Sequence, residues 1–285
     1  METATTPGRD EMRATMHAMW NGVAPAWAHH ATYVDARAEP VTDRLLDGVA
    51  LRPGDRVLEL GAGAGGLGLA AAERLGAGGR VTISDVAPAM VEAADGRARE
   101  RGLTNVETKV LDIEQINEPD GSYDVVLCRD GLQFAADPAR GAREMTRVLW
   151  PGGRLAVATW ASKQENPWLG VLMDAFAEET GRQVPPPGMP GPFALADPER
   201  LQQIFTEAGL TVAVEPHPAP MRVPSFEDWW ERTVALAGPV AGLLRKLPPE
   251  TVAAVRTRAR LETERYATES GLELPGVALL AIGKL

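Results

Sequence analysis

The sequence predicts an α/β protein built on a doubly wound, mostly parallel seven-stranded sheet with an inserted helical cap. Between about residues 40 and 160, short apolar runs alternate with helical segments of 10–15 residues, the pattern of crossover connections in a parallel sheet. Beyond Trp160 this rhythm changes, and the chain closes with a strongly apolar run, "GVALLAIGKL". These observations place extra helices beside the last strands.

The N-terminal part reads as helical. Residues 1 to about 10 are polar and expected to be frayed. Helical pieces follow from Met12 to about Ala38, with a break expected near Pro25, and another helix covers 40–50. The core strands that come next are bounded by turn signals, and we expect them at 56–62, 80–85, 106–112, 123–130 and 154–160. Helices between them are expected at 66–76, 87–102 and 138–149.

The C-terminal part combines two more strands with the cap. Strands are expected at 211–216 and in the closing run, and helices at 166–181, 197–210, 226–247 and 250–270. Asp197 is a plausible N-cap, and the proline-dense "VPPPGMPGP" is a candidate hinge or a static linker. We therefore divide the chain into an N-terminal helical segment (1–40), a core (41–162), and cap helices interleaved with the last strands (163–285).

Composition narrows the class of protein. The net charge of −10 argues against nucleic acid or an anionic membrane as the main partner. Cys128 is the only cysteine, which excludes an intrachain disulfide and suits a reducing compartment. The sequence shows no apolar signal core and no apolar run of about 18 residues. We expect a soluble cytoplasmic protein, a monomer or homodimer, with a small-molecule partner.

The run "VLELGAGAGGLG" satisfies two nucleotide-binding patterns at once. Gly61, Gly63 and Gly66 spell the G-x-G-x-x-G of dinucleotide enzymes. Gly61, Gly63 and Gly65, preceded by Glu59, equally spell the E-x-G-x-G-x-G of enzymes that use S-adenosylmethionine (SAM). Asp85 ends the second strand and suits a ribose hydroxyl in either class, so it does not decide between them.

Three other features favour SAM. Glu59 lies within the first strand, where its carboxylate suits a cationic cofactor better than a pyrophosphate. Asp112 ends the third strand, where it can accept from the exocyclic amine of an adenine. A tight Pro-Gly-Gly turn in "RVLWPGGRLAV" leads into the fifth strand.

With these motifs in order, residues 50–160 resemble the class I SAM-dependent methyltransferases, which have a Rossmann-like fold. Within them the chain is similar to the ubiquinone/menaquinone-biosynthesis-like small-molecule group. The motifs are "VLELGAGAGGLG", Asp85, Asp112-Ile113, "YDVVLCRDGLQF" and "REMTRVLWPGGRLAV". "PFALADPERLQQIFTEAGL" extends the resemblance more weakly to about residue 210.

The resemblance implies SAM as cofactor, S-adenosyl-L-homocysteine as its product, and a set of contact residues. The methionine end would meet Glu59, Gly61, Ala62 and Gly63, the ribose Asp85, and the adenine Val86, Met90, Asp112 and Ile113, while Arg129 lies where family backbone carbonyls often meet the ammonium group. No metal motif is seen, and none is needed, because the sulfonium already activates the methyl group.

The acceptor side is less defined. Asp130 is the best carboxylate candidate for acceptor contact, or else a cap for "GLQF". His29 and His30 are candidate bases, but a surface or capping role is the competing interpretation. Candidate substrate contacts are Trp27, Tyr33, Gln133 and Trp160, although core packing explains the aromatic residues equally well.

The resemblance implies methyl transfer to a small, largely apolar molecule, such as a natural product or quinone precursor, with oxygen favoured over carbon as acceptor. One alternative is a SAM-binding protein of the same fold that performs other chemistry, such as cyclisation, or holds the cofactor as a structural group. The other alternative is an NAD-dependent oxidoreductase.

Overall fold

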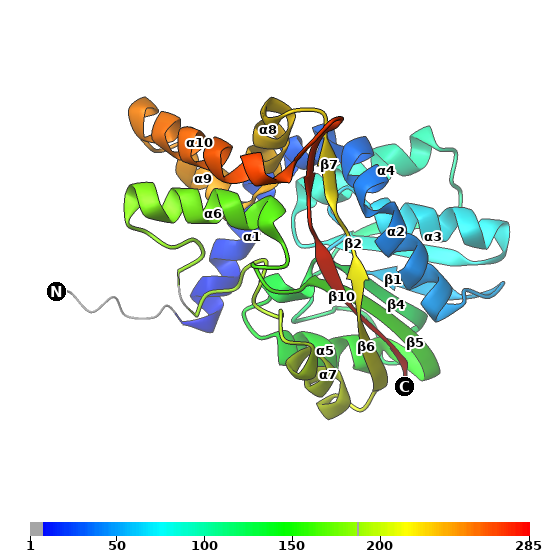
Figure 1. Cartoon of the computed structure of the whole chain (residues 1–285). Coiled ribbons are helices and arrows are strands. Elements are labelled where there is room, and N and C mark those ends of the chain that lie inside the picture. The colour runs from blue at the N-terminus through cyan, green and yellow to red at the C-terminus, as the bar shows by residue number, and fades with distance from the viewer. Residues whose placement is uncertain (1–7, 187) are drawn as a thin grey trace.

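The central sheet has seven strands in the order β3-β2-β1-β4-β5-β10-β6 in the computed structural model, which describes residues 8–186 and 188–285 (Figure 1). Neighbouring strands are parallel, except that β10 runs antiparallel to β5 and β6. The strands are β1 Arg56–Glu59, β2 Arg80–Asp85, β3 Val106–Val110, β4 Tyr123–Arg129, β5 Leu149–Trp160, β6 Thr211–Pro218 and β10 Val277–Lys284. The predicted doubly wound sheet is confirmed.

Helices cover both faces of this sheet (Figure 1). On one face α5 and α7 contribute Met145, Leu201 and Phe205 to an apolar core. On the other, α2, α3 and α4 contribute residues such as Leu45 and Leu67. The bounds are α2 Ala31–Val49, α3 Gly66–Leu75, α4 Pro88–Glu100, α5 Pro138–Val148 and α7 Pro198–Glu207, with short 3₁₀ turns at Gly76–Gly78 (η1) and Leu132–Phe134 (η2).

The cap surrounds a core of its own, in which Phe176, Trp229 and Val255 are fully buried. Its helices group beside the sheet at the upper left of Figure 1. The cap consists of α6 Pro167–Thr180, α8 Phe226–Leu236, α9 Pro239–Leu244, α10 Pro249–Thr263, the turn η3 Glu264–Tyr266, and a small sheet of β7 Met221–Val223, β9 Gly271–Leu274 and β8 Ala267–Thr268.

The N-terminal helix α1 (Arg9–His29) runs without a break through Pro25, so the expected break is in the wrong place. The chain turns at His30 instead, before α2 begins. Proline removes the hydrogen bond to Asn21, four residues earlier, but Asn21 is exposed and water can bind its carbonyl. Of the segment expected to be frayed, residues 1–7 lie outside the described residues, and the helix has begun by Arg9.

Several other boundaries differ from prediction. The helix expected at 226–247 is divided into α8 and α9. The Pro-Gly-Gly turn lies within β5, because Leu149 already pairs with Tyr123 and a bulge absorbs the irregularity. The helix expected at 250–270 ends at Thr263, and the chain then forms β8 and β9. The predicted cap at Asp197 is confirmed, because its side chain accepts from the backbone N–H groups of Glu199 and Arg200. Pro187, in the proline-dense stretch, lies outside the described residues.

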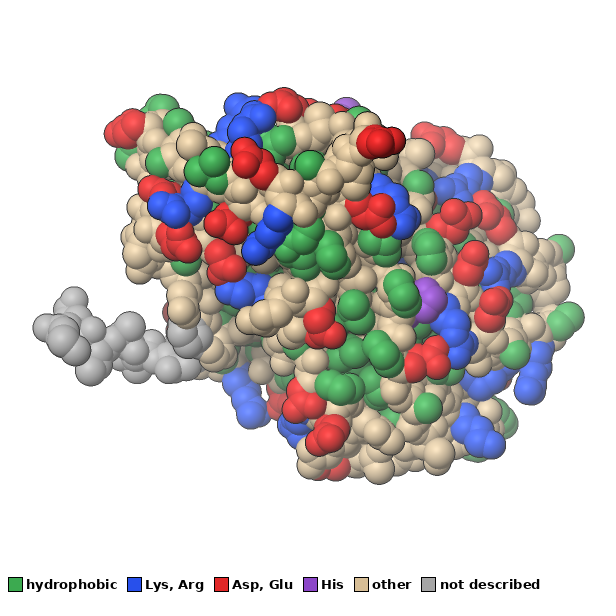
Figure 2. Space-filling view, in the orientation of Figure 1, with side chains coloured by type: hydrophobic (Ala, Val, Ile, Leu, Met, Phe, Trp, Pro, Cys, Tyr) green, Lys and Arg blue, Asp and Glu red, His purple; other side chains and the backbone are tan. Residues whose placement is uncertain are grey.

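The full sequence has 39 acidic and 29 basic side chains. On the face shown in Figure 2 the two kinds are interspersed, and apolar side chains gather near its middle. Within residues 8–186 and 188–285, no helix is long and apolar enough to cross a membrane.

Candidate active site

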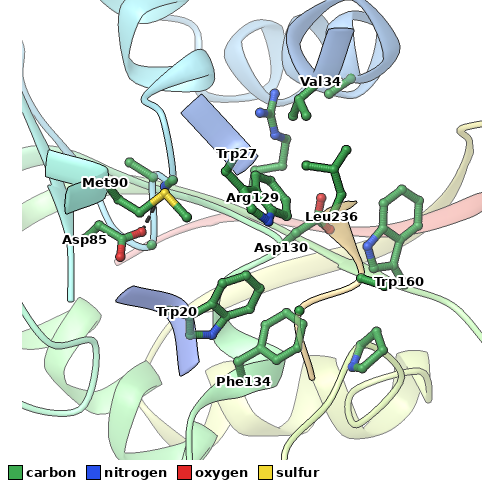
Figure 3. Close-up of a pocket in the computed structure, with 18 of the residues that line it drawn as sticks. Trp20, Trp27, Val34, Asp85, Met90, Arg129, Asp130, Phe134, Trp160 and Leu236 are labelled. Carbon is green, nitrogen blue, oxygen red and sulfur yellow. Dashed lines mark hydrogen bonds between the residues drawn. The ribbon is translucent and has the colours of Figure 1, made fainter. Parts of the chain in front are cut away.

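An elongated cavity lies at the carboxyl ends of β1, β2, β4 and β5, where doubly wound sheets bind their ligands. It encloses about 200 Å³. Figure 3 shows Asp85 and Met90 at one end, Asp130 further along, and Trp160 with Leu236 at the other end. The walls come from the sheet edge, from α1 and α2, and from cap residues such as Trp168, Met221 and Leu236.

The glycine loop after β1 forms part of the cavity wall. Gly61 and Gly63 adopt φ values of 63° and 55°, a left-handed conformation that favours glycine. A Cβ on Gly61 would lie 3.2 Å from the Cα of Gly131, and one on Gly63 would lie 3.6 Å from the ring of Trp27. Gly61, Ala62 and Gly63 all line the cavity, and the Trp27 ring packs against the loop at Gly63.

Glu59 does not line the cavity. Its buried carboxylate lies behind the loop, where it accepts from the backbone N–H of Gly68 at 2.8 Å. Burial raises the pKa of Glu59 to about 8, although Arg129 and the Gly68 hydrogen bond oppose this. In this arrangement Glu59 braces the start of α3 and reaches a ligand only through the loop.

Asp85 ends β2 and borders the cavity. One carboxylate oxygen accepts from the N–H of Gly63 and the other from the N–H of Ala87, each at 2.9 Å. Burial raises the pKa of Asp85, against the effect of these hydrogen bonds. Each carboxylate oxygen can still accept another hydrogen bond. Asp85 therefore holds the glycine loop in place and can also bind ligand hydroxyls.

Asp112 borders the same end of the cavity and is held by the N-terminal helix. Its Oδ2 accepts from Nε of Arg13 at 2.6 Å and lies 3.1 Å from Nε2 of His17. Its Oδ1 accepts from the backbone N–H of Glu114 at 2.7 Å. Sequence reasoning missed Arg13 and His17, because nothing in the helical pattern ties them to a carboxylate about 100 positions away.

Apolar side chains complete this end. Met90 packs with Trp20 and Trp27 of α1 in a small cluster, and Val86 and Ile113 also line the cavity. The edge of the Trp20 ring meets Phe134 of η2, with 4.8 Å between centroids. These residues provide faces on which a flat heterocycle can pack.

Arg129 ends β4, with its guanidinium turned toward α2. Its Nη1 donates to Oγ1 of Thr42 at 2.5 Å, so the side chain fixes α2 against the sheet. The cavity borders Arg129, Gly61 and Gly131 together. The structure thus brings together all the predicted cofactor residues at the cavity wall except Glu59.

Asp130, the next residue, has a left-handed backbone (φ 59°) and a buried Oδ1 without a hydrogen-bond partner. Its N–H bonds to the carbonyl of Ala158, which fixes this turn at the end of β4. Aspartate tolerates left-handed φ better than most residues. Burial raises the pKa of Asp130 to about 6, and the positive charges of Arg129 and Arg37, together with the neighbouring amide of Gln133, limit the rise.

The acceptor end also contains residues that the sequence analysis did not single out. Arg37 lies 3.8 Å from the ring centroid of Trp168 and 5.3 Å from that of Trp160. Arg232 lies 4.4 Å from the ring of Tyr33, whose buried hydroxyl has no hydrogen-bond partner. Arginines within amphipathic helices are common on surfaces, so their sequence context carried no signal.

Three predicted candidates do not line the cavity. His29 is exposed and His30 partly buried, and their rings contact each other at the junction of α1 and α2. Gln133 is buried in η2, and neither polar atom of its side chain has a partner. The three aromatic candidates for substrate contact, Trp27, Tyr33 and Trp160, do line the cavity, whereas Gln133 does not.

The lone cysteine and the possible metal ligands form no further site in the described residues. Cys128 is fully buried in β4, and burial raises the pKa of its thiol to about 12, so the thiol stays protonated. Across the described ranges, no group of three or more His, Cys, Asp or Glu side chains is arranged to hold a metal ion.

Known proteins share this architecture. The model of the methyltransferase domain family matches residues 51–209. Nocamycin O-methyltransferase of Saccharothrix syringae is 32% identical over 200 residues, which cover 66% of this chain and 71% of that protein. The ubiquinone/menaquinone biosynthesis C-methyltransferase UbiE of Hydrogenovibrio crunogenus is 34% identical over 128 residues, covering 45% and 50% respectively.

Other relatives match over a shorter share of their length. An uncharacterized protein of Mycobacterium tuberculosis is 31% identical over 160 residues, 55% of each chain, so the chain spans about half the length of several curated relatives it matches. Among solved structures, the [4+2]-cyclase SpnF superposes with a TM-score of 0.57 at 21% identity, covering 93% of this chain and 95% of that one.

Proposed function

The chain belongs to the SAM-dependent methyltransferase family, and on that premise we propose that it transfers a methyl group from SAM to an oxygen atom of a small, largely apolar molecule. This family assignment excludes the alternative of an NAD-dependent oxidoreductase. The observation that carries the proposal is Asp130 at the acceptor end, whose buried Oδ1 has no hydrogen-bond partner and can accept a proton. The similarity to nocamycin O-methyltransferase supports oxygen as the acceptor atom.

The residues at the other end fit SAM. Asp85 can accept from the ribose hydroxyls, and Asp112 from the adenine amine, while Met90, Val86 and Ile113 pack on the rings. Gly61 and Gly63 line the same cavity as Asp130. When bound, SAM supplies a methyl group on a cationic sulfur that leaves as the neutral thioether of S-adenosyl-L-homocysteine.

Asp130 then acts as the general base. The acceptor hydroxyl gives its proton to Oδ1 as its oxygen bonds to the methyl carbon. A base with a pKa near 6 is ionised at neutral pH and still basic enough to assist. Burial under the cap excludes water, and holding two reactants in line can lower the barrier by about 7–11 kcal/mol. Aromatic and apolar side chains around the acceptor support a natural-product or quinone-type substrate.

The competing function is non-methylating chemistry on the same fold, such as cyclisation, with SAM as a structural group. The similarity to SpnF shows a shared fold and does not favour that chemistry. We also propose that the protein works in the cytoplasm on a dissolved small molecule, as a monomer or homodimer. The interspersed surface charges and the net charge of −10 support this proposal.

A radiolabelled-methyl assay tests the function. The purified chain is incubated with methyl-labelled SAM and a library of apolar phenols, enols and hydroxy acids, and extracts are separated by chromatography. We expect labelled product on oxygen, located by NMR. Turnover of an acceptor without label in the product would refute methyl transfer, and label on carbon would refute the oxygen assignment.

A further inference from the structure

The guanidinium group of Arg37 is held in place by two tryptophans. Arg37 projects from α2, and its Cζ lies 3.8 Å from the ring centroid of Trp168 at the start of α6 and 5.3 Å from that of Trp160 at the end of β5. The cap and the sheet therefore meet at this side chain, which lines the acceptor end of the cavity. A guanidinium fixed against aromatic faces is preorganised for planar recognition.

Arg37 has hydrogen-bonding capacity that the described residues do not use. Its Nε and Nη2 are buried and donate to no protein atom. Burial lowers the pKa of Arg37 to about 10, so the group remains a cation at neutral pH. Buried donors without partners cost free energy, and in native proteins they commonly mark a ligand or a functional role.

Two other arginines that line the cavity have partners. Arg129 donates to Thr42 at 2.5 Å. Arg232 donates to Asp228 at 3.3 Å while lying over the ring of Tyr33. Both therefore have a structural role that explains their position. Arg37 differs from them because the one carboxylate that acts on its charge is Asp130, to which it makes no hydrogen bond or ion pair within the described part of the chain.

We propose that Arg37 binds a carboxylate of the acceptor, so that the substrate is an apolar hydroxy acid. This inference rests on the proposed function, because it assigns the hydroxyl to Asp130 and the carboxylate to Arg37. The Nε and Nη2 groups form one edge of the guanidinium, whose parallel N–H bonds match the two oxygens of a carboxylate. The carboxylate stays unmodified, and it orients the hydroxyl toward the base.

Paired acids and esters test the charge requirement. Binding of 1-hydroxy-2-naphthoate and of 3-hydroxydecanoate is measured by calorimetry with S-adenosyl-L-homocysteine at saturation, and each is compared with its methyl ester. We expect at least one acid to bind about tenfold more tightly than its ester or better, as for loss of a charge-assisted hydrogen bond. In Arg37→Met, which keeps a straight apolar chain against Trp168, we expect that preference to disappear while ester affinity changes less than about twofold.

Arg232→Met is the matched control, because it removes another cavity arginine that lies on an aromatic ring. It should retain the preference for the acid. The inference is overturned if neither acid is preferred by the wild-type protein, or if Arg37→Met weakens acid and ester equally, as a purely structural role requires. The binding experiment does not involve methyl transfer. If the acid preference is absent, the labelled-methyl assay can still confirm the proposed function. If the labelled-methyl assay fails, the acid preference can still be measured.

Discussion

At the glycine-loop end of the cavity, both oxygens of Asp85 and both oxygens of Asp112 accept hydrogen bonds from the chain itself. At the other end, Asp130, Arg37 and Tyr33 all keep buried polar atoms without partners. The carboxylates of the first end are thus fixed by the chain itself, and only the buried Nε1 of Trp27 lacks a partner there among the described residues. The second leaves its partners to be supplied by the substrate, which is how one fold can serve one cofactor and many acceptors.

The substitution Asp130→Asn is expected to have the largest effect on the acceptor end of the cavity. Asparagine tolerates the left-handed backbone at this position, so the fold should survive while the proton acceptor is lost. We expect methyl transfer to fall by about 10²–10⁴-fold, measured with labelled SAM and the acceptor found in the assay. In the wild-type protein, kcat/KM should rise with pH through about 6 and level off above it, since the ionised carboxylate is the active form.

The matching readout is affinity for S-adenosyl-L-homocysteine. In Asp130→Asn it should stay within about twofold of the wild-type value, because the cofactor end does not depend on this residue. Equal turnover in the two proteins would remove Asp130 from the chemistry.

Asp85→Ala tests the other end. We expect it to weaken cofactor binding by about 1–3 kcal/mol, which is about 5- to 150-fold in Kd, measured by calorimetry. Asp95→Ala, which removes a partly exposed carboxylate from α4 outside the cavity, controls for the change in net charge. Unchanged affinity in a folded Asp85→Ala protein would refute the ribose contact.

The two ends also differ in how far the sequence could predict them. The glycine loop, Asp85 and Asp112 follow strands in a fixed order, so local patterns and strand ends sufficed to place them at one edge. Arg37 and Trp168 meet only because the cap folds over α2, and contacts between such distant segments leave no periodic signal. Glu59 was predicted to hold the cofactor, but the pleat of β1 turns it toward Gly68, behind the loop.

Glu59→Gln tests this position of Glu59 through the pH dependence of the stability of the fold. Because burial raises the pKa of Glu59 from 4.5 to about 8, the folded chain keeps a proton that the unfolded chain has released. Stability from this group is therefore greatest at low pH and falls as pH rises from about 4.5 to about 8. We expect the variant to lose less stability than the wild type between pH 5 and pH 8, measured by urea unfolding.

The side-chain oxygen of the glutamine can still accept the hydrogen bond from the N–H of Gly68. The variant therefore keeps the fold, and only the titrating group is removed. Asp85 and Asp130, whose pKa values are also raised, keep part of the pH dependence in both proteins. An identical pH slope in variant and wild type would show that Glu59 is ionised in the folded state, as a direct contact with a cationic cofactor requires.

His30→Gln should have the smallest effect, with turnover within about twofold of the wild type. A general base must come within about 3 Å of the proton it removes, and His30 does not line the cavity. Burial and the neighbouring His29 lower its pKa, so it is already neutral at pH 7 and its charge plays no part there. A tenfold loss, measured in the same labelled-methyl assay, would mean that the junction of α1 and α2 moves into the acceptor end during turnover. The general base would then be His30, on a segment that moves, and not Asp130 at the end of β4. The acceptor end would then depend on the position of α1.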